Sequence, residues 1–249
     1  MLILLLYGVN FLIEPSGDLY ILKYTGDSKR YNMDVGAGIK VKLLKYKKFS
    51  FFVSYVNELD MAKQVGNISL DPYYGHWYIT GGFELALKNL LLFGHITHDC
   101  LHSVDRPPDS NKVVFNRFSI GMGNIPFFPI KQRITRDSWR FTYTYYPHSR
   151  VIDYLNSVDM WHDFRIFFKK RLYFQNAFFI NGGIETLFTL WINEENPKGF
   201  TQTNIVLNFE AGYENKNKAL LLIFEYFPLA EYQFKAPQGL WRIGVGYLF

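Results

Sequence analysis

The last eleven residues of the chain, GLWRIGVGYLF at 239–249, alternate between two kinds of side chain. Successive residues of a β-strand point to opposite faces, so alternate residues share a face. One face here is large and apolar, with Trp241, Ile243, Val245, Tyr247 and Phe249. The opposite face carries Arg242, Gly244 and Gly246. The segment is therefore predicted to be an amphipathic strand that ends in an aromatic carboxy terminus.

The same alternation recurs along most of the chain. Residues 31–45, for example, place apolar side chains from Tyr31 to Leu43 on one face, and polar or glycine residues from Asn32 to Lys42 on the other. The pattern provides no helix to cover these apolar faces, and no stretch approaches the ~18 uninterrupted apolar residues of a membrane-spanning helix. Lipid is then the expected partner of the apolar faces. Strands cross a bilayer only as a closed barrel, because an open sheet edge would leave backbone groups unpaired in lipid.

We therefore predict an all-β protein: a single antiparallel transmembrane β-barrel domain over residues 1–249, with about twelve strands and with the last strand closing on the first. The predicted strands are 7–13, 31–45, 49–58, 75–87, 90–102, 113–124, 134–146, 157–169, 172–190, 201–213, 218–230 and 239–249. Residues 14–30 are expected to form a folded first outer loop, because a further crossing by residues 19–24 would make the strand number odd. The short turns, including a basic one between 169 and 172, are expected in the periplasm and the long loops outside. The apolar run 2–6 lacks the basic start and cleavage site of a complete signal peptide, so residues 1–13 are either a strand or the remnant of a signal.

Composition supports this class and excludes others. Aromatic residues make up 19% of the chain against 20% charged residues, which suits aromatic girdles on either side of an apolar band. The net charge is +5, but the 27 Lys and Arg residues are scattered, so nucleic acid is not an expected partner. Cys100 is the only cysteine, which excludes an intrachain disulfide and a cysteine-rich zinc site. No cofactor is expected.

The end of the chain also carries a family resemblance. Its pattern of Arg242, Gly244, Tyr247 and Phe249 resembles the carboxy-terminal signal by which bacterial outer-membrane β-barrels are recognised for assembly. The resemblance implies an integral protein of the Gram-negative outer membrane. Its expected partners are the barrel-assembly machinery, outer-membrane lipid and lipopolysaccharide, and any protein partner stays undefined.

Charged residues fall on the side of the strands opposite the apolar stripe, where they would face the lumen. A charge that faced lipid at mid-depth would cost ~2–4 kcal/mol, which explains the segregation. Among these residues, four arginines are predicted to pair with five acids: Arg117, Arg140, Arg165 and Arg242 with Asp159, Asp163, Glu185, Glu210 and Glu225. Because both signs are mixed, strong ion selectivity is not expected. Two functions stay open, a small-solute channel with a narrow lumen and a structural or complex-forming barrel.

One segment has the residue types for catalysis. The stretch GHITHDCLH at 94–102 holds three of the six histidines, and alternation places His98 and Cys100 on the outward face, with Asn116 beside them on the next strand. A base, a nucleophile and an orienting amide would then adjoin one another. A metal site would need His98, Cys100 and His102 as ligands. Alternate residues of one strand lie ~6.6–6.8 Å apart, which is awkward for ligands of a single ion, so no metal site is expected.

These residues resemble outer-membrane phospholipase A, a twelve-stranded family with a His-x-Ser pair and an Asn on the neighbouring strand. The resemblance implies a lipid hydrolase at the outer leaflet, often assisted by calcium, in which His98 is the general base, Cys100 the nucleophile and Asn116 the orienting residue. It covers about twenty-five residues. Cys100 stands where the family has serine, and Leu101-His102 stands where the family has Asn-Gly. The oxyanion hole and the calcium site are therefore unsupported, and the hydrolase is the alternative to a non-enzymatic barrel.

Overall fold

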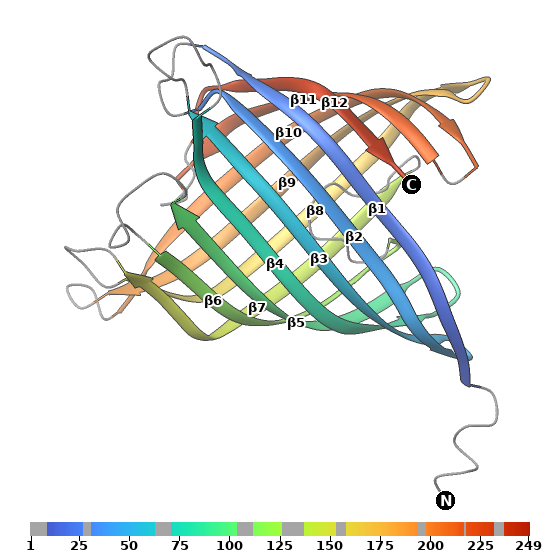
Figure 1. The fold of residues 1–249 in the computed structure, drawn as a ribbon, viewed down its shortest axis with the longest axis horizontal. Helices are drawn as coiled ribbons and strands as arrows, with labels where there is room; N and C mark the ends of the chain where they lie inside the picture. Colours follow the sequence, from blue (N-terminus) through green and yellow to red (C-terminus); the bar gives the residue numbers. More distant parts are fainter. Residues whose placement is uncertain are drawn as a thin grey trace, which may run out of the picture.

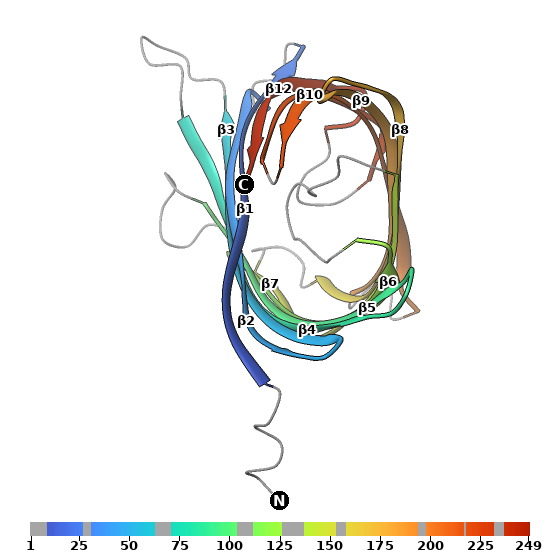
Figure 2. The same ribbon diagram turned by 90° about the vertical axis from the view of Figure 1, so that its right-hand side faces the viewer.

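The computed structural model describes residues 9–26, 31–62, 71–103, 112–125, 137–152, 158–193, 198–216, 218–231 and 237–249. Its elements are β1 (Val9–Thr25), β2 (Met33–Tyr46), β3 (Phe49–Ala62), β4 (Asp71–Ala86), β5 (Leu91–Ser103), β6 (Lys112–Gly123), β7 (Ser138–Ile152), β8 (Val158–Gln175), β9 (Phe178–Asn193), β10 (Phe200–Asn215), β11 (Lys218–Ala230) and β12 (Trp241–Leu248). Each strand pairs antiparallel with its neighbours in sequence, and β1 pairs with β12, so the sheet closes on itself (Figures 1 and 2). The predicted twelve-stranded antiparallel barrel is confirmed. The described part of the chain contains no helix long and apolar enough to span a membrane.

The alternation of the last strand is present in the structure. Trp241, Ile243 and Val245 are exposed on the outside of the barrel, whereas Gly246 and Leu248 are buried on the inside. The strand pairs with β1 from Trp241 opposite Thr25 to Leu248 opposite Asp18. Phe249 extends this seam, because its backbone N–H and C=O both hydrogen-bond to Gly17, at 3.0 and 2.9 Å.

Aromatic side chains gather on the outer surface toward both ends of the strands. Toward the long connections, Tyr226 and Trp241 stack with ring centroids 4.6 Å apart. Toward the short turns, the rings of Phe49 and Phe83 stack at 5.4 Å. These pairs lie near opposite ends of the strands, where membrane barrels carry their aromatic girdles. We call the end with the tight turns after β2, β4, β8 and β10, where the β6–β7 connection also lies, the short-turn end, and the opposite end the long-loop end.

The prediction for residues 14–30 is wrong, because β1 continues through them to Thr25. The sequence Glu14-Pro15 lies within this strand, and the structure accommodates it with a register shift against β2 between Phe11 and Glu14. Pro15 lies where β1 has a neighbour only on the β2 side, since β12 stops opposite Gly17. A missing N–H is tolerated at such an edge. Residues 19–24 therefore belong to the first crossing, and residue 7 of the predicted first strand lies outside the described residues.

The predicted basic turn near residue 170 is also wrong. The turn between β8 and β9 lies at Asn176 and Ala177, whose φ angles of 50° and 71° match the left-handed conformation of a tight hairpin. Lys169 and Lys170 instead belong to β8 and point to opposite faces. Lys169 pairs with the inward Glu210, and Lys170 pairs with Asp137 on the outside. Both cations are therefore compatible with a paired strand.

The other boundaries differ by a few residues. Strand β4 begins at Asp71, and β7 extends to Ile152 into a segment that was expected to be a loop from residue 147. The chain after β6 turns inward, because the side chain of Ile125 is buried against the lumen-facing Phe167. These differences lengthen the strands and leave the order and the number of crossings unchanged.

Phe249 holds the seam at the short-turn end, so replacing it should impair assembly. We expect Phe249→Ser to lower the amount of folded protein in outer-membrane fractions severalfold, measured by heat-modifiable mobility on gels. Leu220→Ser, which removes an exposed outward residue of β11, is the control for lost apolar area. An unchanged yield for Phe249→Ser would contradict the assignment of the assembly signal.

Candidate functional site

Ion pairs on the inside brace the seam between the first and last strands. The guanidinium of Arg242 on β12 donates hydrogen bonds to Glu225 on β11 and to Asp34 on β2. The hydroxyl of Tyr24 on β1 donates to the same Asp34 carboxylate at 2.9 Å. Four strands around the closure are thereby linked by charge-assisted hydrogen bonds, which are stronger than neutral ones.

A second group of contacts continues around the wall through β3 to β6. Glu58 on β3 accepts hydrogen bonds from Tyr20 on β1 and, at 3.3 Å, from Tyr78 on β4. Asp99 on β5 lies between the His76 imidazole and Arg117, whose guanidinium is 3.2 Å from the carboxylate. The carboxylates of this wall are therefore held by tyrosine and histidine as much as by cations.

The third group lies on β7 to β10. The hydroxyl of Tyr146 donates to Asp163 at 2.5 Å. Arg165 lies 3.5 Å from Glu185, and the Lys169 ammonium is 2.5 Å from Glu210. Together, the three groups form a nearly continuous polar belt inside the barrel.

The predicted pairings are realised in part. Arg165 and Arg242 lie against Glu185 and Glu225, as expected. The partner of Arg117 is Asp99, which the sequence argument omitted although its alternation with His98 and Cys100 places it inward. Two more acids of the prediction have other partners: Glu210 pairs with Lys169, and Asp163 accepts a hydrogen bond from Tyr146. Arg140 lies inside, with its guanidinium 6.0 Å from the Phe167 ring centroid. The side chain of Asp159 is not among those that the structure describes.

A cavity of about 290 Å³ opens between these groups, in the half of the lumen toward the long-loop end. Its walls include aromatic rings such as Tyr78, Phe115 and Phe227. Seven carboxylates line it, from Glu58, Asp60, Asp99, Asp163, Glu185, Glu210 and Glu225, against four cations, from Arg117, Arg165, Lys169 and Arg242. With His76 neutral, the lining has a formal excess of three negative charges. Both signs are present, as predicted, with a moderate balance toward acid.

Toward the short-turn end, apolar side chains occupy the inside of the wall. One cluster comprises Tyr20, Leu22, Phe179, Ala219, Leu221, Ile223 and Leu248. On the facing wall Phe52 packs with Phe93, and the Lys40 ammonium lies 4.1 Å from the Phe52 ring centroid. The lumen is therefore polar and hollow toward the long-loop end, whereas toward the short-turn end apolar side chains lie on the inner wall beside ion pairs such as Lys40–Glu84 and Arg171–Glu214.

Glycines on the inner face provide the room for these rings. A Cβ added at Gly82 would lie 2.9 Å from the Phe52 ring, and one at Gly212 would lie 2.8 Å from the Phe179 ring. Both distances are too short for a real side chain. The glycines that recur within the strands thus let the aromatic rings lie against the wall.

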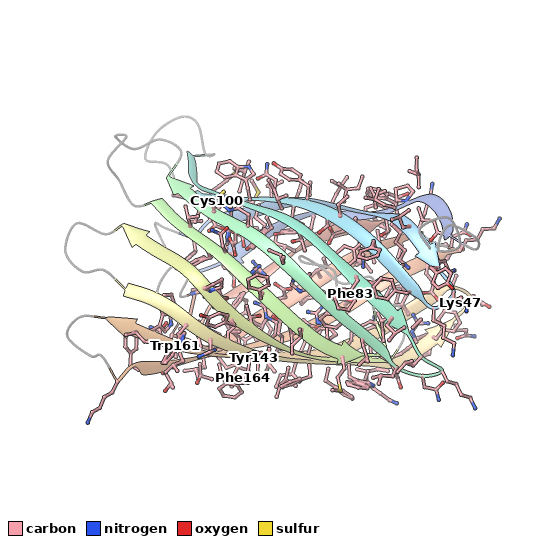
Figure 3. All side chains as sticks on the ribbon, turned by 90° about the horizontal axis from the view of Figure 1, so that it is seen from below. Lys47, Phe83, Cys100, Tyr143, Trp161 and Phe164 are labelled. Atoms are coloured by element: carbon pink, nitrogen blue, oxygen red, sulfur yellow. The ribbon has the colours of Figure 1, made fainter. Side chains whose placement is uncertain are left out.

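The predicted catalytic residues lie on the outer surface of β5 and β6. His98 and Asn116 are directly opposite each other in the ladder, and His98 Nδ1 is 2.8 Å from Asn116 Oδ1. An Nδ1–H that donates to the amide oxygen fixes the tautomer in which Nε2 can accept a proton. Cys100, partly buried, is two residues farther along the same face, opposite Trp77 and Val114 (Figure 3). The structure thus brings His98 and Asn116, the predicted base and orienting residue, into contact and places the Cys100 thiol next along the same face of the strand.

The remaining histidines have separate surroundings. His76 and His95 face the lumen, where His95 Nδ1 is 3.2 Å from the Thr97 hydroxyl. His162 is on the outside, with its Nδ1 2.8 Å from the Tyr143 hydroxyl. Among the residues that the structure describes, no three His, Cys, Asp or Glu side chains are grouped as metal ligands.

Similar solved structures are bacterial outer-membrane proteins. The NanC porin matches 94% of this chain and 98% of its own at 7% identity, with a TM-score of 0.49. OmpT of Vibrio cholerae matches over 96% and 99% of the two chains at 7% identity, with a TM-score of 0.46. The siderophore receptor PirA from Pseudomonas aeruginosa matches 93% of this chain at 11% identity and a TM-score of 0.41, and this chain spans 41% of its length. Likeness at this level assigns no function to the chain.

No known family model matches the sequence, and no characterised protein matches it in a sequence comparison.

Adjacent lysines on β8 provide a matched test of the polar belt. Lys169 and Glu210 have side chains only 3% and 6% exposed, whereas Lys170 and Asp137 are 57% and 53% exposed. Lys169→Met leaves a carboxylate without its cation inside the barrel, which should lower the free energy of unfolding by ~3–5 kcal/mol. The control Lys170→Met should cost ~0–1 kcal/mol, because surface ion pairs contribute little. Urea unfolding in lipid vesicles measures both, and equal losses would show that the inner pair does not brace the barrel.

Proposed function

We propose that this protein is an integral barrel of the bacterial outer membrane whose narrow lumen serves as a low-conductance channel for small solutes. The observation that carries the proposal is the lumen itself, with its charged cavity of about 290 Å³ toward the long-loop end. The barrel-assembly machinery, membrane lipid and lipopolysaccharide are the partners that this location entails. The long-loop end would face the outside and the short turns the periplasm, as in other outer-membrane barrels.

The apolar clusters set the size of the solute. Phe52 and Phe93 on one wall and the cluster around Phe179 on the other narrow the route toward the short-turn end. Only small molecules or ions would pass, and the cross-linked walls of the polar belt resist widening. The excess of carboxylates around the cavity favours cations, since a charged lining concentrates ions of opposite sign. Because the lining also holds four cations, the preference should be modest.

Conductance in planar bilayers tests the channel. We expect small, ohmic currents with a reversal potential that indicates a moderate preference for cations in a KCl gradient. The double variant Phe52→Ala/Phe93→Ala removes two buried rings from the lumen and should raise the conductance severalfold. The control Phe51→Ala/Leu92→Ala changes their outward neighbours and should leave conductance unchanged. Absence of current from both the native protein and the widened variant, with normal membrane insertion, would replace the channel by a structural or complex-forming role.

A second candidate function rests on the hydrogen bond between His98 and Asn116. A lipid hydrolase would use the Nε2 atom of His98 to take the Cys100 thiol proton while the sulfur attacks an ester carbonyl. The alcohol would leave with that proton, and water would then hydrolyse the thioester to release fatty acid. The outward position of the three residues suits a substrate in the outer leaflet. A calcium ion is part of this candidate alone, by resemblance to the phospholipase family.

Fatty-acid release from phospholipid vesicles tests the hydrolase, with and without calcium. If the candidate is correct, Cys100→Ala abolishes release, Cys100→Ser retains part of it, and Asn116→Ala lowers kcat by roughly 10–100-fold through loss of the oriented imidazole. Folding of each variant is checked by heat-modifiable mobility. No release by the native protein under either condition removes this candidate.

A further inference from the structure

The ladder between β7 and β8 ends well before the strands do. It runs from Ser138 opposite Lys169 to Tyr145 opposite His162. Beyond that point β7 stays paired with β6 as far as Ile152, and the start of β8, from Val158, stays paired with β9. Within the described residues, no backbone pair joins β7 to β8 above Tyr145. The backbone ladder between these two strands is therefore open at the long-loop end, and we call this unpaired stretch the gap.

Local sequence explains why the strands part. Pro147 on β7 has no N–H to donate to a ladder, and it is the second residue past the last pair. The register of β7 against β6 shifts between Asn116 and Phe118, opposite Pro147. The register of β8 against β9 shifts at Trp161. Bulges bend and twist the strands that carry them, and here two bulges at one height coincide with the end of the pairing between β7 and β8.

The foot of the gap lies beside the cavity. Tyr146 on β7 and Asp163 on β8 both line the cavity, and their 2.5 Å hydrogen bond spans the two strands at the foot of the gap. Phe115 packs edge-on against Tyr146, with ring centroids 5.7 Å apart. A side-chain hydrogen bond can break without disturbing a backbone ladder, so this contact can act as a latch.

The outer side of the gap carries an aromatic cluster of Tyr143, Tyr145, Trp161, His162 and Phe164. The His162 ring lies 4.8 Å from Trp161 and 5.5 Å from Tyr145, between centroids. Trp161 is 43% exposed, and Tyr143, Trp161 and Phe164 lie close together on this part of the wall (Figure 3). Amphipathic rings of this kind sit at the headgroup level of a membrane. The gap begins at that level, where water and headgroups can satisfy backbone groups that hydrocarbon could not.

We propose that the gap is a lateral portal through which single-tailed amphipaths with a cationic head pass between the outer leaflet and the lumen cavity. The aromatic cluster would take the upper part of the tail, and the latch would open to admit the head. The excess of three negative charges in the cavity lining selects a cationic head over an anionic one. The proposal gives the lumen of the proposed channel a second entrance, but the portal does not depend on ion conduction.

Fluorescence quenching tests access through the wall. In a Cys100→Ser background, a bimane label is attached at Phe115→Cys, beside the gap, or at Phe227→Cys on β11. Both positions are buried, inward-facing and line the cavity. Phospholipid brominated near the headgroup end of its acyl chains should quench the label at 115 severalfold more than the label at 227, whereas aqueous iodide should quench both alike. Equal lipid quenching at the two positions would overturn the portal.

Two further arms test the latch and the ligand. Tyr146→Phe removes the hydroxyl that holds Asp163 and should increase lipid quenching at 115 without altering it at 227; no change would overturn the latch. Dodecyltrimethylammonium should protect the label at 115 from lipid quenching at severalfold lower concentration than dodecyl sulfate does. Equal protection would overturn the selection of a cationic head. Because none of these measurements uses current, a failed channel and a failed portal are distinguishable.

Discussion

Backbone hydrogen bonding in lipid is the constraint on which the rest of this structure depends. A strand that crosses hydrocarbon must find a partner for every N–H and C=O, and β1 and β12 therefore have to meet. They do so in register from Thr25 to Asp18, and Phe249 adds a last pair of hydrogen bonds at Gly17. Departures from pairing occur toward the ends of the strands: at the start of β1, which carries Pro15, and between β7 and β8 beyond Tyr145.

Closure of the barrel then determines which face of each strand can hold charged side chains. With lipid on the outside, the lumen is the place for charged residues, and a confined interior requires them to be paired or hydrogen-bonded. The belt from Arg242 around to Lys169 meets this requirement with tyrosine hydroxyls and histidine as well as ion pairs. The same belt leaves an acidic cavity toward the long-loop end of the lumen, while aromatic rings packed against glycines lie on the inner wall toward the other end. The proposed channel and the bracing of the wall would therefore both follow from one arrangement.

Much of this could be predicted from the sequence, because alternation reports directly on a wall with lipid on one side. It gave the barrel, the strand number, the inward position of Arg117 and the meeting of His98 with Asn116. It failed in two places. The requirement for an even strand number assigned residues 14–30 to a loop, although β1 continues through them to Thr25. The cations between 169 and 172 were interpreted as a turn, although acids on both faces of the sheet pair with Lys169 and Lys170.

Partner choice inside the lumen could not be predicted in the same way. Alternation says that a side chain points inward, but the partner depends on strand stagger and bulges, which place Arg117 beside Asp99 and Glu210 beside Lys169. The gap beyond Tyr145 is likewise a product of two bulges in separate hairpins. Pro147 is the one residue in the sequence that indicates this loss of pairing.

Disulfide cross-linking across the seam tests the central claim most directly. Ile21 on β1 and Val245 on β12 are outward-facing partners in the register of the closed barrel. In a Cys100→Ser background in native membranes, Ile21→Cys/Val245→Cys should form an intramolecular disulfide rapidly and nearly completely, whereas the offset pair Ile21→Cys/Trp241→Cys should not. Rapid bonding of the offset pair, or of neither pair, would contradict the closed barrel on which this account rests.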